Sequence, residues 1–181
     1  MPQLTIYPSD DSYTDSGAAT TNYGTNASLR IENSALNGYK NMFLKFSTAT
    51  IPAGQKINSA ILYLYVKDEA ANLTDCQVKL CDADWAEGTI LYNGQPGVSG
   101  GTIHTFAFTT GNDWTNSGNV FATTVSNWYK GITNNYGITI RKASQQTGAG
   151  NLYSKEQGTT YDPYLLVTYE PEQHGFFFFM T

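Results

Sequence analysis

The octapeptide AILYLYVK at residues 60–67 decides the fold of this chain. Side chains alternate between the two faces of a strand, so Leu62, Leu64 and Val66 would share one face here. The opposite face would also be apolar, since it would carry Ile61 and Tyr63. Hydrophobicity on both faces indicates a central strand that is covered from both sides.

Similar short runs recur along the rest of the chain, separated by clusters of Gly, Asn, Ser, Thr, Asp and Pro. Their spacing of about eight to twelve residues is typical of a sandwich or barrel. We therefore predict an all-β fold, an antiparallel, jelly-roll-like β-sandwich of about nine strands. The predicted strands cover residues 4–7, 28–32, 41–47, 60–67, 76–82, 103–108, 136–142, 151–155 and 164–169.

One segment departs from this pattern. Val125, Trp128 and Tyr129 stand at helical spacing, and Gly131 follows them. This arrangement predicts one short helix over residues 123–130.

The length of 181 residues suits a single domain, which we place at residues 1–170, followed by a tail at 171–181. Pro171 is expected to break any strand, and the tail is too short to span a bilayer. Burial of four phenylalanines would contribute roughly 6–12 kcal/mol, so the tail should be packed. It packs on its own domain, docks into a neighbouring subunit as an assembly arm, or derives from cloning. The assembly contact would comprise Phe176, Phe177, Phe178, Phe179 and Met180.

The two cysteines indicate a reducing compartment. Cys76 and Cys81 lie on one predicted strand, roughly 16 Å apart and on opposite faces, too far for a disulfide. We expect two structural thiols, one of them buried with Val78 and Leu80. The amino terminus carries no recognisable export signal, so folding in a reducing cytoplasm is favoured.

Charge argues against two classes of partner. The chain has 10 basic and 15 acidic residues, a formal net charge of −5. That balance lacks the basic footprint of a nucleic-acid or anionic-membrane binder. We expect no nucleic-acid partner and no membrane insertion.

Material for catalysis is sparse. The sequence lacks a nucleophile elbow, a phosphate-binding glycine loop and paired metal-binding cysteines. His104 sits in a predicted strand and is best explained as structural. Asp84, Glu87 and Asp113 lie beside tryptophans in turns, where acidic residues usually serve capping and solubility. We predict no enzymatic activity and no catalytic residues.

Asp10, Asp11 and Asp15 form the densest cluster of oxygen ligands in the sequence. Calcium needs six to eight oxygens, and this spacing matches no known calcium loop. The prediction is therefore no cofactor, with a structural calcium ion as the open alternative.

Four aromatic residues in predicted loops could stack on sugar rings, because Tyr and Trp combine flat apolar area with a polar group. Acidic polysaccharides would also need cations, and Lys40, Arg141 and Lys142 are few for that purpose. The candidate carbohydrate-binding residues are Tyr39, Tyr92, Trp114 and Tyr161.

A series of segments resembles a known family. These segments are DSY at 11–13, TNYG at 21–24, LRI at 29–31, FLKF at 43–46, IPAG at 51–54, WAEGTI at 85–90, NYG at 135–137, YSKE at 153–156 and PYLLVTY at 163–169. In this order they resemble the disaggregatase-related repeat family, DNRLRE, which overlaps a family of alginate-type carbohydrate-binding modules. The resemblance implies a jelly-roll-like sandwich without catalysis, found on secreted polysaccharide enzymes, surface proteins and some virus particles.

Two functional hypotheses follow. The first is a surface or structural module of an assembled particle, such as a virion decoration or fibre-like subunit, with glycan adhesion as an added role. It would contact protein subunits through the tail and lie on a virion or cell surface. The alternative is a carbohydrate-binding module of a secreted or cell-surface polysaccharide-active protein, with a polysaccharide as its partner.

Overall fold

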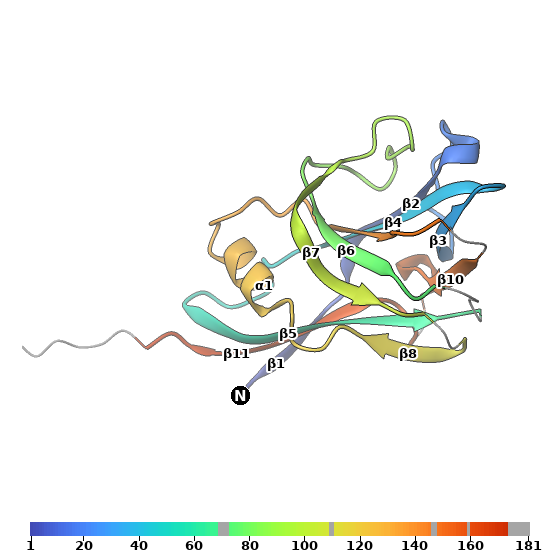
Figure 1. The fold of residues 1–181 in the computed structure, drawn as a ribbon. Coiled ribbons are helices and arrows are strands. Elements are labelled where there is room, and N and C mark those ends of the chain that lie inside the picture. The colour runs from blue at the N-terminus through green and yellow to red at the C-terminus, as the bar shows by residue number, and fades with distance from the viewer. Residues whose placement is uncertain (69–72, 109–110, 146–147, 159, 174–181) are drawn as a thin grey trace, which may run out of the picture.

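The strands of this protein pair into one continuous antiparallel sheet in a computed structural model that describes residues 1–68, 73–108, 111–145, 148–158 and 160–173 (Figure 1). In chain order the strands are β1 Gln3–Ile6, β2 Pro8–Asp15, β3 Ser28–Ser34, β4 Gly38–Phe46, β5 Gln55–Val66, β6 Cys76–Cys81, β7 Val98–Phe106, β8 Asp113–Asn116, β9 Ile138–Lys142, β10 Ala149–Tyr153 and β11 Tyr164–Pro171. The helices are α1 Ala122–Tyr129 and two short 3₁₀ turns, η1 Ser16–Ala18 and η2 Lys155–Gln157.

The strand order is β1-β11-β5-β10-β3-β4-β9-β6-β7, with β2 paired to β4 and β8 paired to β5. The sheet folds over on itself, so that β6 and β7 lie above β5 and β8 (Figure 1). One half of the sandwich contains β1, β11, β5 and β8. The other contains β2, β4, β9, β6 and β7, and β3 pairs with β10 between them. The predicted all-β sandwich is confirmed.

Strand β5 is central, between β11 and β10, as its sequence predicts, but only one of its two faces is fully covered. Leu62, Leu64 and Val66 are buried in the core, where they belong to one hydrophobic cluster with Val78 of β6 and Ile140 of β9. Each fully buried aliphatic side chain contributes about 1.5–3 kcal/mol. The tyrosines of β5 lie on the outer face and stay half-buried.

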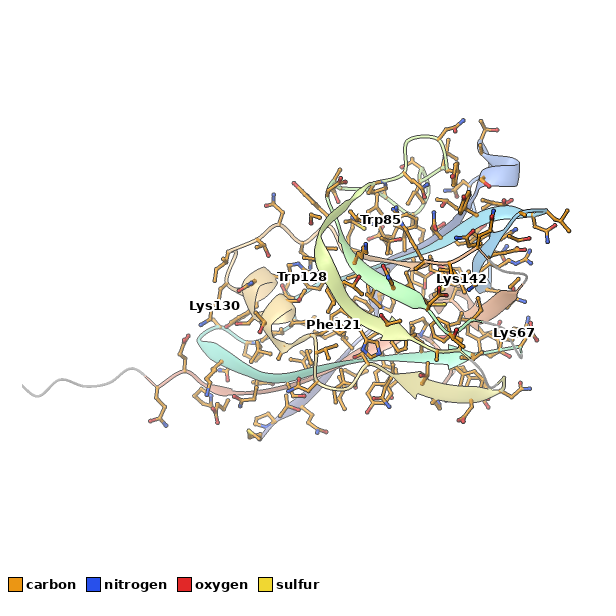
Figure 2. The ribbon with its side chains drawn as sticks, viewed as in Figure 1. Lys67, Trp85, Phe121, Trp128, Lys130 and Lys142 are labelled. Carbon is orange, nitrogen blue, oxygen red and sulfur yellow. The ribbon has the colours of Figure 1, made fainter. Side chains whose placement is uncertain are left out.

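The predicted helix is confirmed within one residue at each end. Val125 and Trp128 of α1 are buried with Phe121, and the helix packs against β5 (Figure 2). Gly131, with φ of 66°, follows its last turn. Within the described residues, no helix is both long and apolar enough to cross a membrane.

Three expectations about strands were wrong. β2 and β8 were not predicted, because PSDDSYTD lacks apolar alternation and β8 has only four residues. Pro171 does not break β11 but ends it, paired with Gln55, since a terminal proline removes only one donor from the ladder. The predicted assembly contact at residues 176–180 lies outside the described residues.

Both cysteines are free and buried. Cys76 belongs to the main core, and Cys81 belongs to a second cluster on the outer face with Phe43, Trp85 and Ile90. The two thiols therefore lie on opposite faces of β6, as predicted. Burial raises the pKa of each thiol to about 12, so both stay protonated and unreactive at neutral pH.

Candidate functional site

A groove of about 440 Å³ lies on the outer face of the half-sheet that contains β4, β9 and β6. Strand alternation forms its floor, because Gln77 and Lys79 of β6 alternate with the buried Cys76 and Val78. The volume falls within the range of about 300–1,000 Å³ that is usual for small-molecule sites. The groove is therefore large enough to hold part of a polymeric ligand.

The loop at residues 82–97, between β6 and β7, forms one wall of the groove. Trp85 anchors this loop: its side chain packs edge-on against Phe43 with ring centroids 5.7 Å apart. Its indole N–H donates to the carbonyl oxygen of Tyr136 over 2.8 Å. In Figure 2 Trp85 lies over the upper half of the sandwich. Because this anchor holds the loop down, Tyr92 is positioned at the groove.

Three cations line the groove. The side chain of Lys142 is fully buried and pairs with Asp75 at 2.8 Å, so its charge is neutralised. Arg141 donates from Nη2 to the carbonyl oxygen of Pro96 over 2.7 Å, and Lys79 forms no ion pair with a described residue. No carboxylate is among the described residues that line the groove. The groove is therefore locally positive in an acidic protein.

The structure changes which cations are available. Lys40 was one of the three cations that the sequence suggested, but it lies away from this groove. It is buried and bound to Glu32 at 2.7 Å, with Asp15 at 3.6 Å. Lys79 takes its place. Sequence analysis missed Lys79, although its alternation with Val78, which is buried, indicated that its side chain points outward.

Amide side chains also face the groove. Asn33 is buried, and its Nδ2 donates to the carbonyl oxygen of Lys142 over 3.1 Å. Its Oδ1 accepts no hydrogen bond from any described residue. A buried amide oxygen without a donor is uncommon in folded proteins, so a ligand hydroxyl is a suitable partner.

The four predicted carbohydrate-binding aromatics fall on two surfaces. Tyr39 and Tyr92 line the groove. Trp114 lies on β8, and both it and Tyr161 contact Tyr65 on the outer face of β5. This second face belongs to the other half of the sandwich, so the structure brings the four together as two separate pairs.

The second face is an aromatic ladder that the sequence analysis only partly identified. Tyr63 stacks on Tyr164 with centroids 4.7 Å apart and an interplanar angle of 11°. Tyr153 likewise stacks on Tyr161 at 5.6 Å. Because these rings stack on one another, much of their flat area is already covered. They serve the sheet as cross-strand pairs more than they offer a surface for sugars.

A cluster of carboxylates joins β2, the loop at residues 82–97 and η2. Atoms of Asp11, Glu87 and Glu156 lie within 4.8 Å of one another. Lys155 Nζ lies 2.7 Å from Glu87 Oε1 and 2.6 Å from Glu156 Oε1, and the Lys155 backbone N–H donates to Asp11 Oδ2 over 2.8 Å. Burial raises the pKa of Asp11 to about 8. Burial disfavours the charged form of Asp11, so this site favours a positive charge or a proton.

The three aspartates of the predicted calcium cluster do not converge. They lie along β2, and among the described residues Asp11 alone joins the carboxylate cluster. Asp10 accepts a hydrogen bond from the Glu87 backbone N–H over 3.3 Å, and Asp15 accepts one from Gly17 over 2.8 Å. Glu87 and Glu156, which are remote in sequence, complete the carboxylate cluster with Asp11 in place of Asp10 and Asp15.

The acidic residues that were considered for catalysis have separate structural contacts. Asp84 pairs with Lys45 at 2.7 Å, and that hydrogen bond lowers the pKa of Asp84. Glu87 belongs to the carboxylate cluster, and Asp113 begins β8 on the aromatic face. His104 packs edge-on against a neighbouring phenylalanine of β7 at 4.5 Å, in keeping with a structural role.

Comparison with protein families adds an independent finding. The model of carbohydrate-binding module family 96 matches residues 2–169, which spans the sandwich from β1 into β11. A comparison with curated proteins finds no match. The family match confirms the carbohydrate-binding part of the resemblance and does not show membership of the disaggregatase-related repeat family.

Proposed function

Because the chain belongs to carbohydrate-binding module family 96, we propose that it binds a polysaccharide without cleaving it, in the groove beside loop 82–97. The observation that carries this proposal is the unpartnered, buried Oδ1 of Asn33 in a groove that also holds cations and tyrosines. The groove thus combines a hydrogen-bond acceptor, positive charge and aromatic area.

Each group has a role in this proposal. Asn33 Oδ1 accepts a hydrogen bond from a sugar hydroxyl, and Tyr39 and Tyr92 contact the apolar faces of sugar rings. Arg141 and Lys79 favour carboxylate groups on the polymer, because neither forms an ion pair with a carboxylate at the groove. We therefore propose an acidic polysaccharide as the preferred ligand.

We test the proposal by measuring affinity for neutral glucans, mannans and xylans and for polyuronates. Tyr39→Ala is expected to weaken binding about tenfold or more, since a well-buried aromatic contact is worth about 1.5–3 kcal/mol. Lys79→Ala should weaken binding of polyuronates selectively, and this loss should shrink at high salt.

The aromatic face supplies matched controls. Tyr161 is 39% exposed, close to the 45% of Tyr39, and Lys67 is a cation near Tyr153. Tyr161→Ala and Lys67→Ala should leave affinity unchanged. Loss of binding in these two variants, with none in Tyr39→Ala and Lys79→Ala, would move the site to the other face. Absence of binding to every polymer would refute the proposal.

We keep a location on the surface of an assembled particle as a second proposal. Its support is the pair of free, buried thiols, which suits folding in a reducing compartment. Docking through residues 176–180 stays a prediction, which the mass of the protein in solution tests. This proposal is compatible with glycan binding, because the groove would remain available on a particle surface.

A further inference from the structure

The carboxylate cluster has an imbalance of charge. With all three carboxylates ionised, the one ammonium group in the cluster, that of Lys155, leaves two negative charges. The ammonium contacts only the Oε1 atoms of Glu87 and Glu156. One divalent cation would neutralise the remaining charge.

Two oxygens of the cluster are buried without a donor. Asp11 is only 1% exposed, and its Oδ1 accepts no hydrogen bond from the part of the chain that the structure describes. Glu156 Oε2 is likewise buried and unpartnered. The carboxyl groups of Asp11 and Glu156 face each other, so both orphan oxygens belong to the same small space. Burial of unpaired anionic oxygens is costly unless a cation or a proton joins them.

Net charge favours a divalent cation over a proton. A proton shared by Asp11 and Glu156 would satisfy both orphan oxygens but would leave one negative charge on the cluster, whereas one divalent cation would neutralise it. One oxygen of each carboxylate lies within 4.8 Å of the other two, so an ion at their centre would lie at most about 2.8 Å from each, close to the calcium–oxygen distance of 2.3–2.6 Å. The ligands are all carboxylate oxygens, which favours a hard cation over zinc or copper.

We propose that Asp11, Glu87 and Glu156 bind one calcium ion. The ion joins β2, the loop at residues 82–97 and η2, three segments that are far apart in the sequence. Since the same loop forms the wall of the groove, the calcium ion also stabilises the wall. The site is separate from the groove, so it goes beyond the proposed function and does not depend on it.

The test uses the full chain after treatment with EDTA and dialysis into metal-free buffer. Thermal unfolding and isothermal titration calorimetry are measured with CaCl2 and then with MgCl2. At about 100 times its Kd, CaCl2 should raise Tm by about 5–10 °C. Mg²⁺ should give a smaller shift, because it dehydrates reluctantly and demands octahedral geometry.

Two variants locate the ion. Asp11→Asn and Glu156→Gln should abolish the Tm shift that CaCl2 produces, and Asp15→Asn, on the same strand as Asp11, should keep it. If Asp11→Asn fails to fold, Glu156→Gln and the titration of the unaltered protein still decide the question. Equal Tm in EDTA and CaCl2 together with no binding heat would overturn the proposal. So would a calcium shift that both variants retain.

Discussion

Replacement of Trp85 tests whether one side chain holds the wall of the groove in place. The indole is 7% exposed and lies in the small outer cluster with Phe43. Its N–H donates to the carbonyl oxygen of Tyr136 over 2.8 Å. Trp85→Ala removes the packing and the hydrogen bond, and Trp85→Phe removes mainly the hydrogen bond.

The expected loss follows from these contacts. A buried indole covers about 150–250 Å², which at about 25 cal/mol per Å² amounts to about 4–6 kcal/mol. This is an upper bound because the unfolded chain is not fully extended, and Trp→Ala changes in cores cost about 3–5 kcal/mol. We expect that loss for Trp85→Ala. Trp85→Phe keeps most of the area and should lose about 1–2 kcal/mol.

Urea unfolding measures both free energies, and amide hydrogen exchange across residues 82–97 measures how the loop responds. In both variants the increase in exchange rate over the unaltered protein should be larger in the loop than in β5. Trp85→Ala should also weaken polysaccharide binding, because Tyr92 loses its position. A loss below about 1 kcal/mol for Trp85→Ala, with unchanged loop exchange, would refute the assigned role of Trp85 as the anchor.

Two further predictions concern the scaffold. Gly137 has φ of 78°, and a Cβ there would lie 2.4 Å from a backbone oxygen of β4. Gly137→Ala should therefore cost at least about 2 kcal/mol in urea unfolding, and Gly54→Ala, with φ of 72° and open space around it, should cost only about 1 kcal/mol. Burial would raise the pKa of Asp75, but hydrogen bonds from Lys142 and Ser144 outweigh it and lower that pKa. The ionised Asp75 carboxylate therefore stabilises the folded protein. This stabilisation is present above the pKa of about 3.9 in the unfolded chain and is lost as the pH falls through the lower pKa in the folded protein. Asp75→Asn should thus cost about 1–3 kcal/mol at pH 7 and flatten the acid limb of a stability–pH curve, and equal acid limbs in both proteins would contradict this.

The sequence by itself determined the features that depend on local periodicity. Alternation in residues 60–67 predicts β5 and its buried face, and the spacing of Val125 and Trp128 predicts α1. The opposite faces of Cys76 and Cys81 follow from the same alternation. These predictions succeed because each depends on neighbours a few residues away.

Only the tertiary structure decided where the functional groups meet. Strand β2 is polar and short of apolar alternation, so its pairing with β4 and the burial of Asp11 come from contacts with distant segments. Asp11 is joined to Lys155 across 144 positions, and Glu87 reaches it from a loop between two other strands. The split of the four aromatics between two outer faces has the same cause. Strand order determines which outward residues become neighbours, and sequence spacing carries little information about strand order.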